Sequence, residues 1–219
     1  MSAFTVTGVA GSPFGRAVLA ALEEKGAGYR FEALAPGGGR SAAHLARHPF
    51  GRVPVLEHDG FLLYETQAIL RYLDRVLPTP ALTPGDAKAA ARMDQVMNIS
   101  DWYLCQGVNN VIGFQRIVGP RILGLATDET AIAAAMPKAH TVCAELSRLL
   151  AGQPYFAGNA LSLADLLVGP QLDFLAATPE WTPLTADRPN LVAWLQRMNQ
   201  RPSFQATTWE RVAQLAKAA

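Results

Sequence analysis

The sequence predicts an α/β amino-terminal domain of element order βαβαββα, followed by an all-α carboxy-terminal domain. Residues 1–76 alternate between the two-residue period of strands and the 3.6-residue period of helices, whereas later residues keep only the helical period. Residues 77–85, which contain three prolines and one glycine, separate these regions and are typical of a stiff linker. We therefore expect domains over residues 1–78 and 85–219.

Each element of the first domain has its own signal. The Asp59-Gly60 dipeptide favours a two-residue hairpin turn with positive φ between two short strands. Apolar residues recur at helical spacing between the first two strands and after the hairpin, whereas residues 41–48 indicate only a short, weak helix. The predicted strands are residues 4–9, 29–34, 55–58 and 61–64, and the predicted helices lie around 18–22, 41–48 and 68–76.

The second domain contains one explicit helix start. Ser162 and Asp165 have the spacing of a capping box, and Leu161 with Leu166 has that of a hydrophobic staple. This motif predicts a role in folding, not in chemistry. Helical periodicity covers residues 86–117, 129–150, 162–176 and 190–200.

Composition excludes several classes of protein. A hydrophobic fraction of 50% with 17% charged residues indicates a globular chain, and a net charge of +1 without basic clusters argues against nucleic acid as a partner. No stretch is typical of a secretion signal or a membrane span, so we expect a cytoplasmic protein. Cys105 and Cys143 stand apart from each other, and the four histidines show no ligand spacing, so we expect reduced thiols and no metal.

Three segments of the first domain could carry chemistry. Ser12 followed by Pro13 is the usual order at a helix start, and the same position would present a hydroxyl at the positive end of the helix dipole, where it favours a thiolate. Val53-Pro54 precedes a strand; an ordinary trans bond is the common case, whereas a cis bond would turn the backbone outward to pair with an extended peptide.

Glu65-Thr66 opens the helix after the hairpin. Helix amides could bind a carboxylate there and Glu65 an ammonium group, although a glutamate is also favoured in a first helical turn for its own sake.

The order of these segments resembles the cytosolic glutathione transferase family. The motifs are Ser-Pro-Phe-Gly-Arg-Ala-Val from Ser12, His-Pro-Phe-Gly-Arg-Val-Pro-Val-Leu from His48, and Tyr-Glu-Thr-Gln-Ala-Ile-Leu-Arg-Tyr-Leu from Tyr64. The region around the capping box and the Arg-Pro-Asn-Leu stretch from Arg188 extend the resemblance over nearly the whole chain. No tyrosine or cysteine precedes the first helix, so the resemblance is to a serine-type, bacterial member.

That resemblance implies a thioredoxin-like first domain in which Pro54 is cis, and a homodimer in which Phe50 plugs the partner. It assigns Ser12 as the catalytic hydroxyl and glutathione as co-substrate, with no cofactor. The residues that it assigns to glutathione are Val53 with Pro54 for the cysteinyl unit, Glu65 and Thr66 for the γ-glutamyl end, and Arg52 with Arg40 for the glycyl carboxylate. His48 and Thr66 depart from the family, which usually has Asn and Ser there.

The expected activity is conjugation of the glutathione thiolate to a small hydrophobic electrophile, as in detoxification. The acceptor pocket is expected between the domains, with Phe14 in its wall. Trp102, Phe114 and Trp209 could line the other wall, although a place in the helix core is the commoner role for such aromatics. A glutathione-dependent isomerase or dehalogenase and a non-catalytic binding module remain open alternatives. A disulfide reductase is disfavoured because no cysteine begins the first helix.

Overall fold

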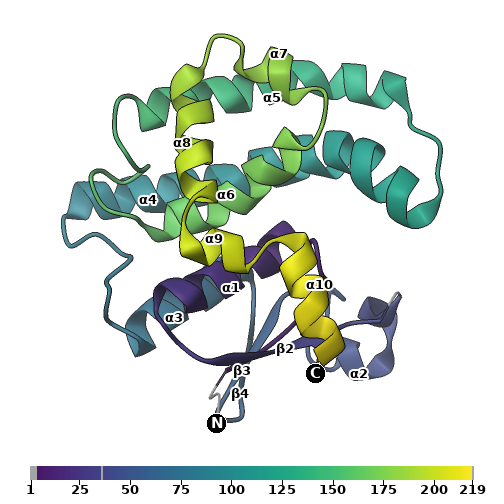
Figure 1. The fold of residues 1–219 in the computed structure, drawn as a ribbon, viewed down its shortest axis with the longest axis vertical. Helices are drawn as coiled ribbons and strands as arrows, with labels where there is room; N and C mark the ends of the chain where they lie inside the picture. Colours follow the sequence, from purple (N-terminus) through teal and green to yellow (C-terminus); the bar gives the residue numbers. More distant parts are fainter. Residues whose placement is uncertain (1–3, 36, 219) are drawn as a thin grey trace. The chain divides into compact units, whose positions relative to one another are not determined.

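A computed structural model describes residues 4–35 and 37–218. Residues 1–3 and 219, the outer ends of the two predicted domains, lie outside the described residues. The chain forms two compact units: one contains the residues up to Thr83 together with those from Asn199 onward, and the other contains Pro84–Met198 (Figure 1).

The first unit is built on a four-stranded sheet of order β2-β1-β3-β4. Its strands are β1 (Phe4–Gly8), β2 (Tyr29–Ala33), β3 (Val55–His58) and β4 (Phe61–Tyr64). β1 and β2 are parallel, whereas β3 is antiparallel to both of its neighbours. The Asp59-Gly60 turn has φ of 49° and 80°, which confirms the predicted hairpin.

Helices α1 (Pro13–Glu24) and α3 (Thr66–Val76) pack on each other, and β1, α1, β2, the short α2 (Ala42–Leu45), β3, β4 and α3 follow in the predicted βαβαββα order. A 3₁₀ turn, η1 (Gly38–Arg40), precedes α2. The core of this unit contains apolar side chains with no solvent exposure, among them Val6, Val18, Leu22, Val55, Leu56, Ile69 and Leu73. This is the α/β half of the expected fold.

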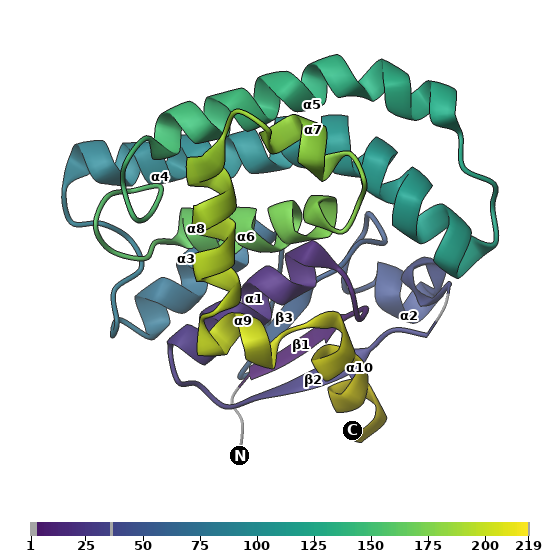
Figure 2. The same cartoon turned by 45° about the horizontal axis from the view of Figure 1, so that its top comes forward.

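The last two helices of the chain also belong to this unit. α9 (Pro202–Ala206) packs on α1 and α10 (Trp209–Ala218) packs on β2, as Figure 2 shows. Arg201 forms a bidentate ion pair with Glu24, in which Nε and Nη2 each donate to one carboxylate oxygen at 2.8 Å. The periodicity of the sequence did not predict these two helices.

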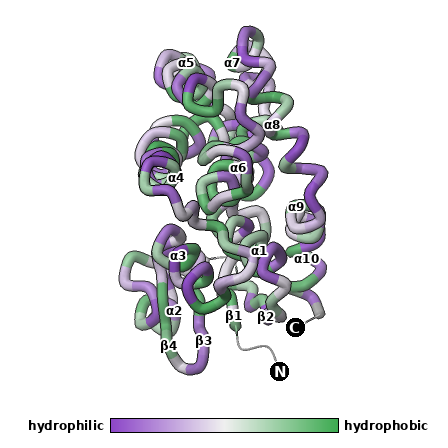
Figure 3. The backbone as a smooth tube through the Cα atoms, turned by 90° about the vertical axis from the view of Figure 1, so that its left-hand side faces the viewer, coloured by the Kyte–Doolittle hydropathy of each residue, from purple (hydrophilic) through white to green (hydrophobic). Residues whose placement is uncertain are grey.

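The second unit is helical apart from its loops and one isolated β-bridge between Tyr155 and Gly158. Its elements are α4 (Ala87–Ile99), a π-type helix η2 (Ser100–Leu123), α5 (Glu129–Leu150), α6 (Leu163–Ala176), α7 (Trp181–Thr185) and α8 (Pro189–Asn199). The periodicity predicted one helix where α4 and η2 follow each other without a break. α6 lies inside the unit with α4 on one side and α8 on the other (Figure 3), and eleven of its residues are buried.

The predicted capping box begins α6. The backbone N–H of Ser162 donates to Oδ2 of Asp165 at 3.0 Å, and the Ser162 hydroxyl donates to the same oxygen at 2.7 Å. Cys105 and Cys143 are both buried and form no disulfide. Burial raises the pKa of the Cys143 thiol to about 11, so this thiol is uncharged near neutral pH.

Candidate active site

Three loops meet at one edge of the sheet. Val55, the first residue of β3, pairs with Thr7 near the end of β1 and with Tyr64 at the end of β4. Because β3 runs antiparallel to both neighbours, its start lies beside their ends. The topology therefore brings together the predicted site segments, residues 9–12, 53–54 and 65–66.

Ser12 is the N-cap of α1. Its backbone N–H donates to the carbonyl of Val9 at 3.2 Å, and its Oγ accepts the N–H of Gly15 at 3.2 Å. Pro13 occupies the first helical position. The cap uses the hydroxyl oxygen as an acceptor, so the Oγ–H can still donate to an anion. The half-buried hydroxyl thus stands at the positive end of a twelve-residue helix.

The Val53-Pro54 bond is cis. Pro54 is buried and Val53 is half-buried. Nε2 of His44, a residue that is 3% exposed, lies 2.8 Å from the carbonyl oxygen of Arg52. Since a carbonyl only accepts, Nε2 donates, and α2 thereby holds the loop that carries the cis bond. Sequence reasoning missed His44, whose only signal was its position four residues before His48.

Glu65 has an unusual backbone conformation, with φ of 69° and ψ of 111°. It is the N-cap of α3, and its carbonyl accepts the N–H of Ile69 at 2.9 Å. The side chain is exposed and makes no hydrogen bond or ion pair with the residues that the structure describes. Thr66 follows at the helix start and is 7% exposed. Residues held in sparsely populated backbone regions cluster at ligand sites, so Glu65 fits a binding role.

Arg40 and Arg52 lie on segments whose backbones touch. A Cβ on Gly39 would stand 2.8 Å from the carbonyl oxygen of Gly51, and a Cβ on Gly51 would stand 2.7 Å from that of Gly39. Only glycine allows this approach. Each arginine directly follows one of the two glycines, and both are exposed. The two cations therefore lie on adjoining turns of backbone.

His48 is buried behind these loops. It is 2% exposed, its ring lies 4.6 Å from that of Tyr64, and its Nδ1 has no hydrogen-bond partner in the described part of the chain. Burial lowers the pKa of His48, with further lowering by His44 and Arg52, while the negative charge of Glu65 opposes this shift. A neutral imidazole thus fills the position that distinguishes this sequence from the usual motif.

The four aromatic candidates for the acceptor pocket differ in how far they are exposed to solvent. Phe14 is half-buried in the first turn of α1. In the helical unit, Trp102 is 68% exposed and Phe114 is half-buried. Trp209, at the start of α10, is 36% exposed and belongs to the first unit.

Two family models match this chain. Residues 6–81 match the model of the glutathione S-transferase N-terminal domain, and residues 110–202 match that of the C-terminal domain. The chain belongs to the glutathione S-transferase family. It is 32% identical over 201 residues to a probable glutathione S-transferase of Oryza sativa subsp. japonica, which covers 91% of this chain and 90% of the relative.

Other members of the glutathione transferase family are similarly close. Glutathione S-transferase 1 of Zea mays is 33% identical, over 84% of this chain and 86% of its own. A theta-class enzyme of Xanthomonas axonopodis pv. citri, solved with glutathione bound, has a TM-score of 0.84 and 28% identity over 95% of this chain and 98% of its own. A glutathione S-transferase-I bound with lactoylglutathione has a TM-score of 0.81 and 28% identity over the full length of both chains.

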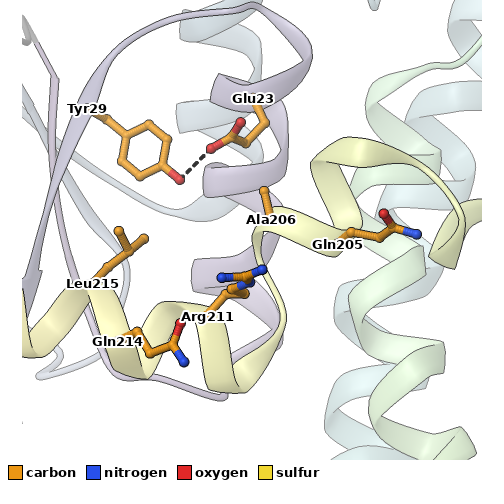
Figure 4. Close-up of a pocket in the computed structure, with 7 residues that line it drawn as sticks. All are labelled: Glu23, Tyr29, Gln205, Ala206, Arg211, Gln214 and Leu215. Carbon is orange, nitrogen blue, oxygen red and sulfur yellow. Dashed lines mark hydrogen bonds between the residues drawn. The ribbon is translucent and has the colours of Figure 1, made fainter.

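The first unit of this transferase has a concave surface that none of the predicted site residues lines. A pocket of about 530 Å³ lies between the end of α1, the start of β2 and the helices α9 and α10 (Figure 4). Tyr29 donates its hydroxyl to Glu23 at 2.7 Å in its wall. No group of three or more possible metal ligands occurs within residues 4–35 and 37–218, and none of the helices described there is long and apolar enough to cross a membrane.

Proposed function

We propose that this transferase conjugates the glutathione thiolate to small hydrophobic electrophiles, with Ser12 as the activating residue. The observation that carries the proposal is the convergence of Ser12, the cis Val53-Pro54 bond and the helix start at Glu65-Thr66 on one edge of the sheet. A peptide that bridges these loops would bring its thiol near a helix N-terminus, where an anion is stabilised.

Each part of glutathione has a chemically matched partner in the proposed site. Thr66 and the first amides of α3 would bind the γ-glutamyl carboxylate, and Glu65 would bind its ammonium group. The Val53 backbone, positioned by Pro54, would pair with the cysteinyl unit as an added strand. Arg52 and Arg40 would bind the glycyl carboxylate, which suits the planar guanidinium group.

The energy required for thiol activation is within reach of these groups. A thiol of pKa near 8.5 is only a few per cent ionised at neutral pH, and lowering that pKa by about 2 units requires roughly 2.7 kcal/mol. A hydrogen bond to a charged group contributes roughly 1.5–3 kcal/mol, and a helix end contributes up to roughly 2 kcal/mol. Ser12 at the start of α1 therefore suffices without a separate base.

The finer assignments are also part of the proposal. They are the serine type of the enzyme, its kinship with bacterial members, the domain limits 1–78 and 85–219, a cytoplasmic location, a role in detoxification and Phe14 as part of the acceptor site. The proposed homodimer draws on Phe50, which is 70% exposed in a loop and would be covered by an isologous contact. Sedimentation that shows only monomer at micromolar concentration would remove the dimer.

Retention of the purified protein on immobilised glutathione, followed by assays against a panel of electrophiles with and without Ser12, tests the function. Conjugation that depends on Ser12 supports it. Turnover only of isomerisable or halogenated substrates would favour the isomerase or dehalogenase. Glutathione binding without turnover of any substrate would indicate a binding module.

A further inference from the structure

The loop that ends in Ser12 is covered by a residue nearly two hundred positions later in the chain. An ideal Cβ on Gly11 would stand 2.6 Å from both Cδ2 and Cε2 of Trp209, and 2.9 Å from Cε3. The indole ring therefore lies directly on the Cα of Gly11, in the space that any side chain at position 11 would need. Gly11 and Trp209 belong to the same compact unit.

This contact bears on the part of the loop that orients the Ser12 hydroxyl. Gly11 has φ of 85°, a conformation that costs little only for glycine, and the next residue donates its backbone N–H to Val9 across the turn. The direction of the Ser12 hydroxyl follows from this turn, because the side chain is attached one residue beyond Gly11. A displacement of the Gly11 backbone would move the hydroxyl by a similar amount.

Trp209 is itself held in place from two sides. On one side, α9 is tied to α1 by the Arg201–Glu24 ion pair and by Arg16, whose guanidinium donates to the carbonyl of Phe204 at 3.2 Å and lies 5.1 Å from the centre of its ring. On the other side, α10 packs on β2 and buries Val212, which is 4% exposed. Since Trp209 begins α10, both attachments limit where the indole can lie.

We propose that Trp209 is a positioning residue that, by packing on Gly11, fixes the turn through which the Ser12 hydroxyl reaches the glutathione thiolate. The inference rests on the proposed function of Ser12. Trp209 touches neither thiol nor acceptor in this role, and its effect passes through the backbone of Gly11 and Ser12. Its removal loosens the turn and weakens the hydrogen bond to the anion more than to the neutral thiol.

The test compares Trp209→Ala with Trp209→Phe. The alanine variant should raise the pKa of bound glutathione by about half to one unit, less than loss of the hydroxyl itself, and should lower kcat/KM near pH 6.5 by about 3- to 10-fold. The Kd for glutathione should change by less than about threefold, because the groups proposed to bind the peptide are untouched. The phenylalanine variant keeps a ring on Gly11 and should titrate close to the parent.

A matched control lies on the same helix. Gln214 lines the pocket of Figure 4 and is exposed, so Gln214→Ala truncates another side chain of α10 and should leave the thiol pKa unchanged. Circular dichroism and melting of every variant establish that the folded proteins are compared. A folded Trp209→Ala protein with the parent's thiolate titration curve would overturn the inference, including the case in which only the KM for the acceptor rises.

The double variant separates this inference from the function on which it rests. If Trp209 acts through Ser12, then Ser12→Ala with Trp209→Ala should titrate like Ser12→Ala alone, because the second change has no hydrogen bond left to weaken. Additive shifts in thiol pKa would contradict a route through Ser12. If Ser12→Ala itself titrates like the parent, the proposed role of Ser12 fails, whereas a shift with Ser12→Ala but none with Trp209→Ala rejects only the role of Trp209.

Discussion

The indole N–H of Trp194 donates a hydrogen bond of 3.1 Å to Oδ1 of Asp165, and neither residue is exposed to solvent. The same carboxylate accepts the backbone N–H of Phe156 at 3.0 Å, together with the two bonds from Ser162. One side chain therefore joins the start of α6, the preceding loop and α8. Burial raises the pKa of Asp165, and the hydrogen bonds from Phe156, Ser162 and Trp194 oppose that shift.

Replacing Asp165 by Ala should destabilise the protein by about 3 kcal/mol or more, because it leaves several buried donors without an acceptor. Asp165→Asn keeps one acceptor oxygen and should cost less. Urea unfolding followed by tryptophan fluorescence measures both. Equal urea midpoints for the parent and the alanine variant would show that these bonds contribute little.

The sequence predicted the capping box from residue spacing, but it did not predict the contact with Trp194. Capping depends on residues three apart, whose geometry is set locally by the helix. The bond from α8 depends on how helices pack, which periodicity leaves undetermined. The same limit applies to Arg201 and Glu24, whose pairing brings the end of the chain to α1. No local pattern indicated that residues after Asn199 group with the first unit.

The candidate site, too, was predicted only in its locally encoded residues and not in its tertiary contacts. Ser12, Pro54 and Glu65 could be singled out because each stands at a helix or strand boundary that has its own sequence signal. The contacts that hold these residues in place were not predicted. His44 gave no sign that it binds the carbonyl of Arg52, and Trp209 gave none that it packs on Gly11. These contacts join residues of different elements, so they follow only from the tertiary structure.

Stability should depend on pH through His48. Its pKa is lowered in the folded state, chiefly by burial, so between that value and the ordinary value near 6.5 the unfolded chain binds more protons than the folded one. The stability that His48 contributes is therefore fully present above pH 6.5 and is lost as the pH falls toward the folded value. Urea unfolding at pH 7.5 and pH 5.5 measures this loss.

The control for this prediction is His48→Asn, which removes the titrating ring and restores the residue usual in the family motif. The variant should lose less stability than the parent between the two pH values. An identical loss in both proteins would assign the pH dependence to other groups.

Gly11→Ala should be more damaging than an ordinary glycine substitution. The new Cβ would stand 2.6 Å from the Trp209 ring. The backbone at Gly11 is also left-handed, with φ of 85°, which disfavours any residue with a Cβ. We expect a loss of about 1 kcal/mol from the backbone and about 1–3 kcal/mol more from the clash. Gly60→Ala is the matched control, since Gly60 has φ of 80° but no atom within 4 Å of its Cβ position. Melting temperatures that fall equally in the two variants would mean that the indole yields easily.

Glu65→Ala should weaken glutathione binding while leaving the melting temperature nearly unchanged. The Glu65 side chain is exposed and makes no hydrogen bond or ion pair within the described residues, so its loss costs the fold little. Toward a ligand ammonium group, the carboxylate should contribute roughly 1.5–3 kcal/mol, equivalent to a rise in Kd of about 10- to 150-fold. Calorimetric titration with glutathione measures the affinity. An unchanged Kd would place the γ-glutamyl group elsewhere.

Ser12→Ala removes the hydroxyl assigned to the thiolate but keeps Pro13 and the start of α1. Because Oγ of Ser12 also accepts the N–H of Gly15, the variant should lose about 1 kcal/mol of stability as well, and the folded fraction must be measured first. Glutathione should still bind, since the groups proposed to hold its two ends are unchanged. If the lost hydrogen bond contributes roughly 1.5–3 kcal/mol to the anion, the pKa of the bound thiol should rise by about 1–2 units.

Turnover of the Ser12→Ala variant should therefore fall near neutral pH and recover in part as the pH approaches the new pKa, because the thiolate and not the hydroxyl is the nucleophile. Ser12→Thr retains a hydroxyl that can both cap the helix and donate to the anion, so it should keep most of the activity and a pKa close to that of the parent. Thiolate absorbance of bound glutathione against pH compares the three proteins. Superimposable curves for the parent and the alanine variant would show that Ser12 only caps α1, and that the helix amides alone activate the thiol.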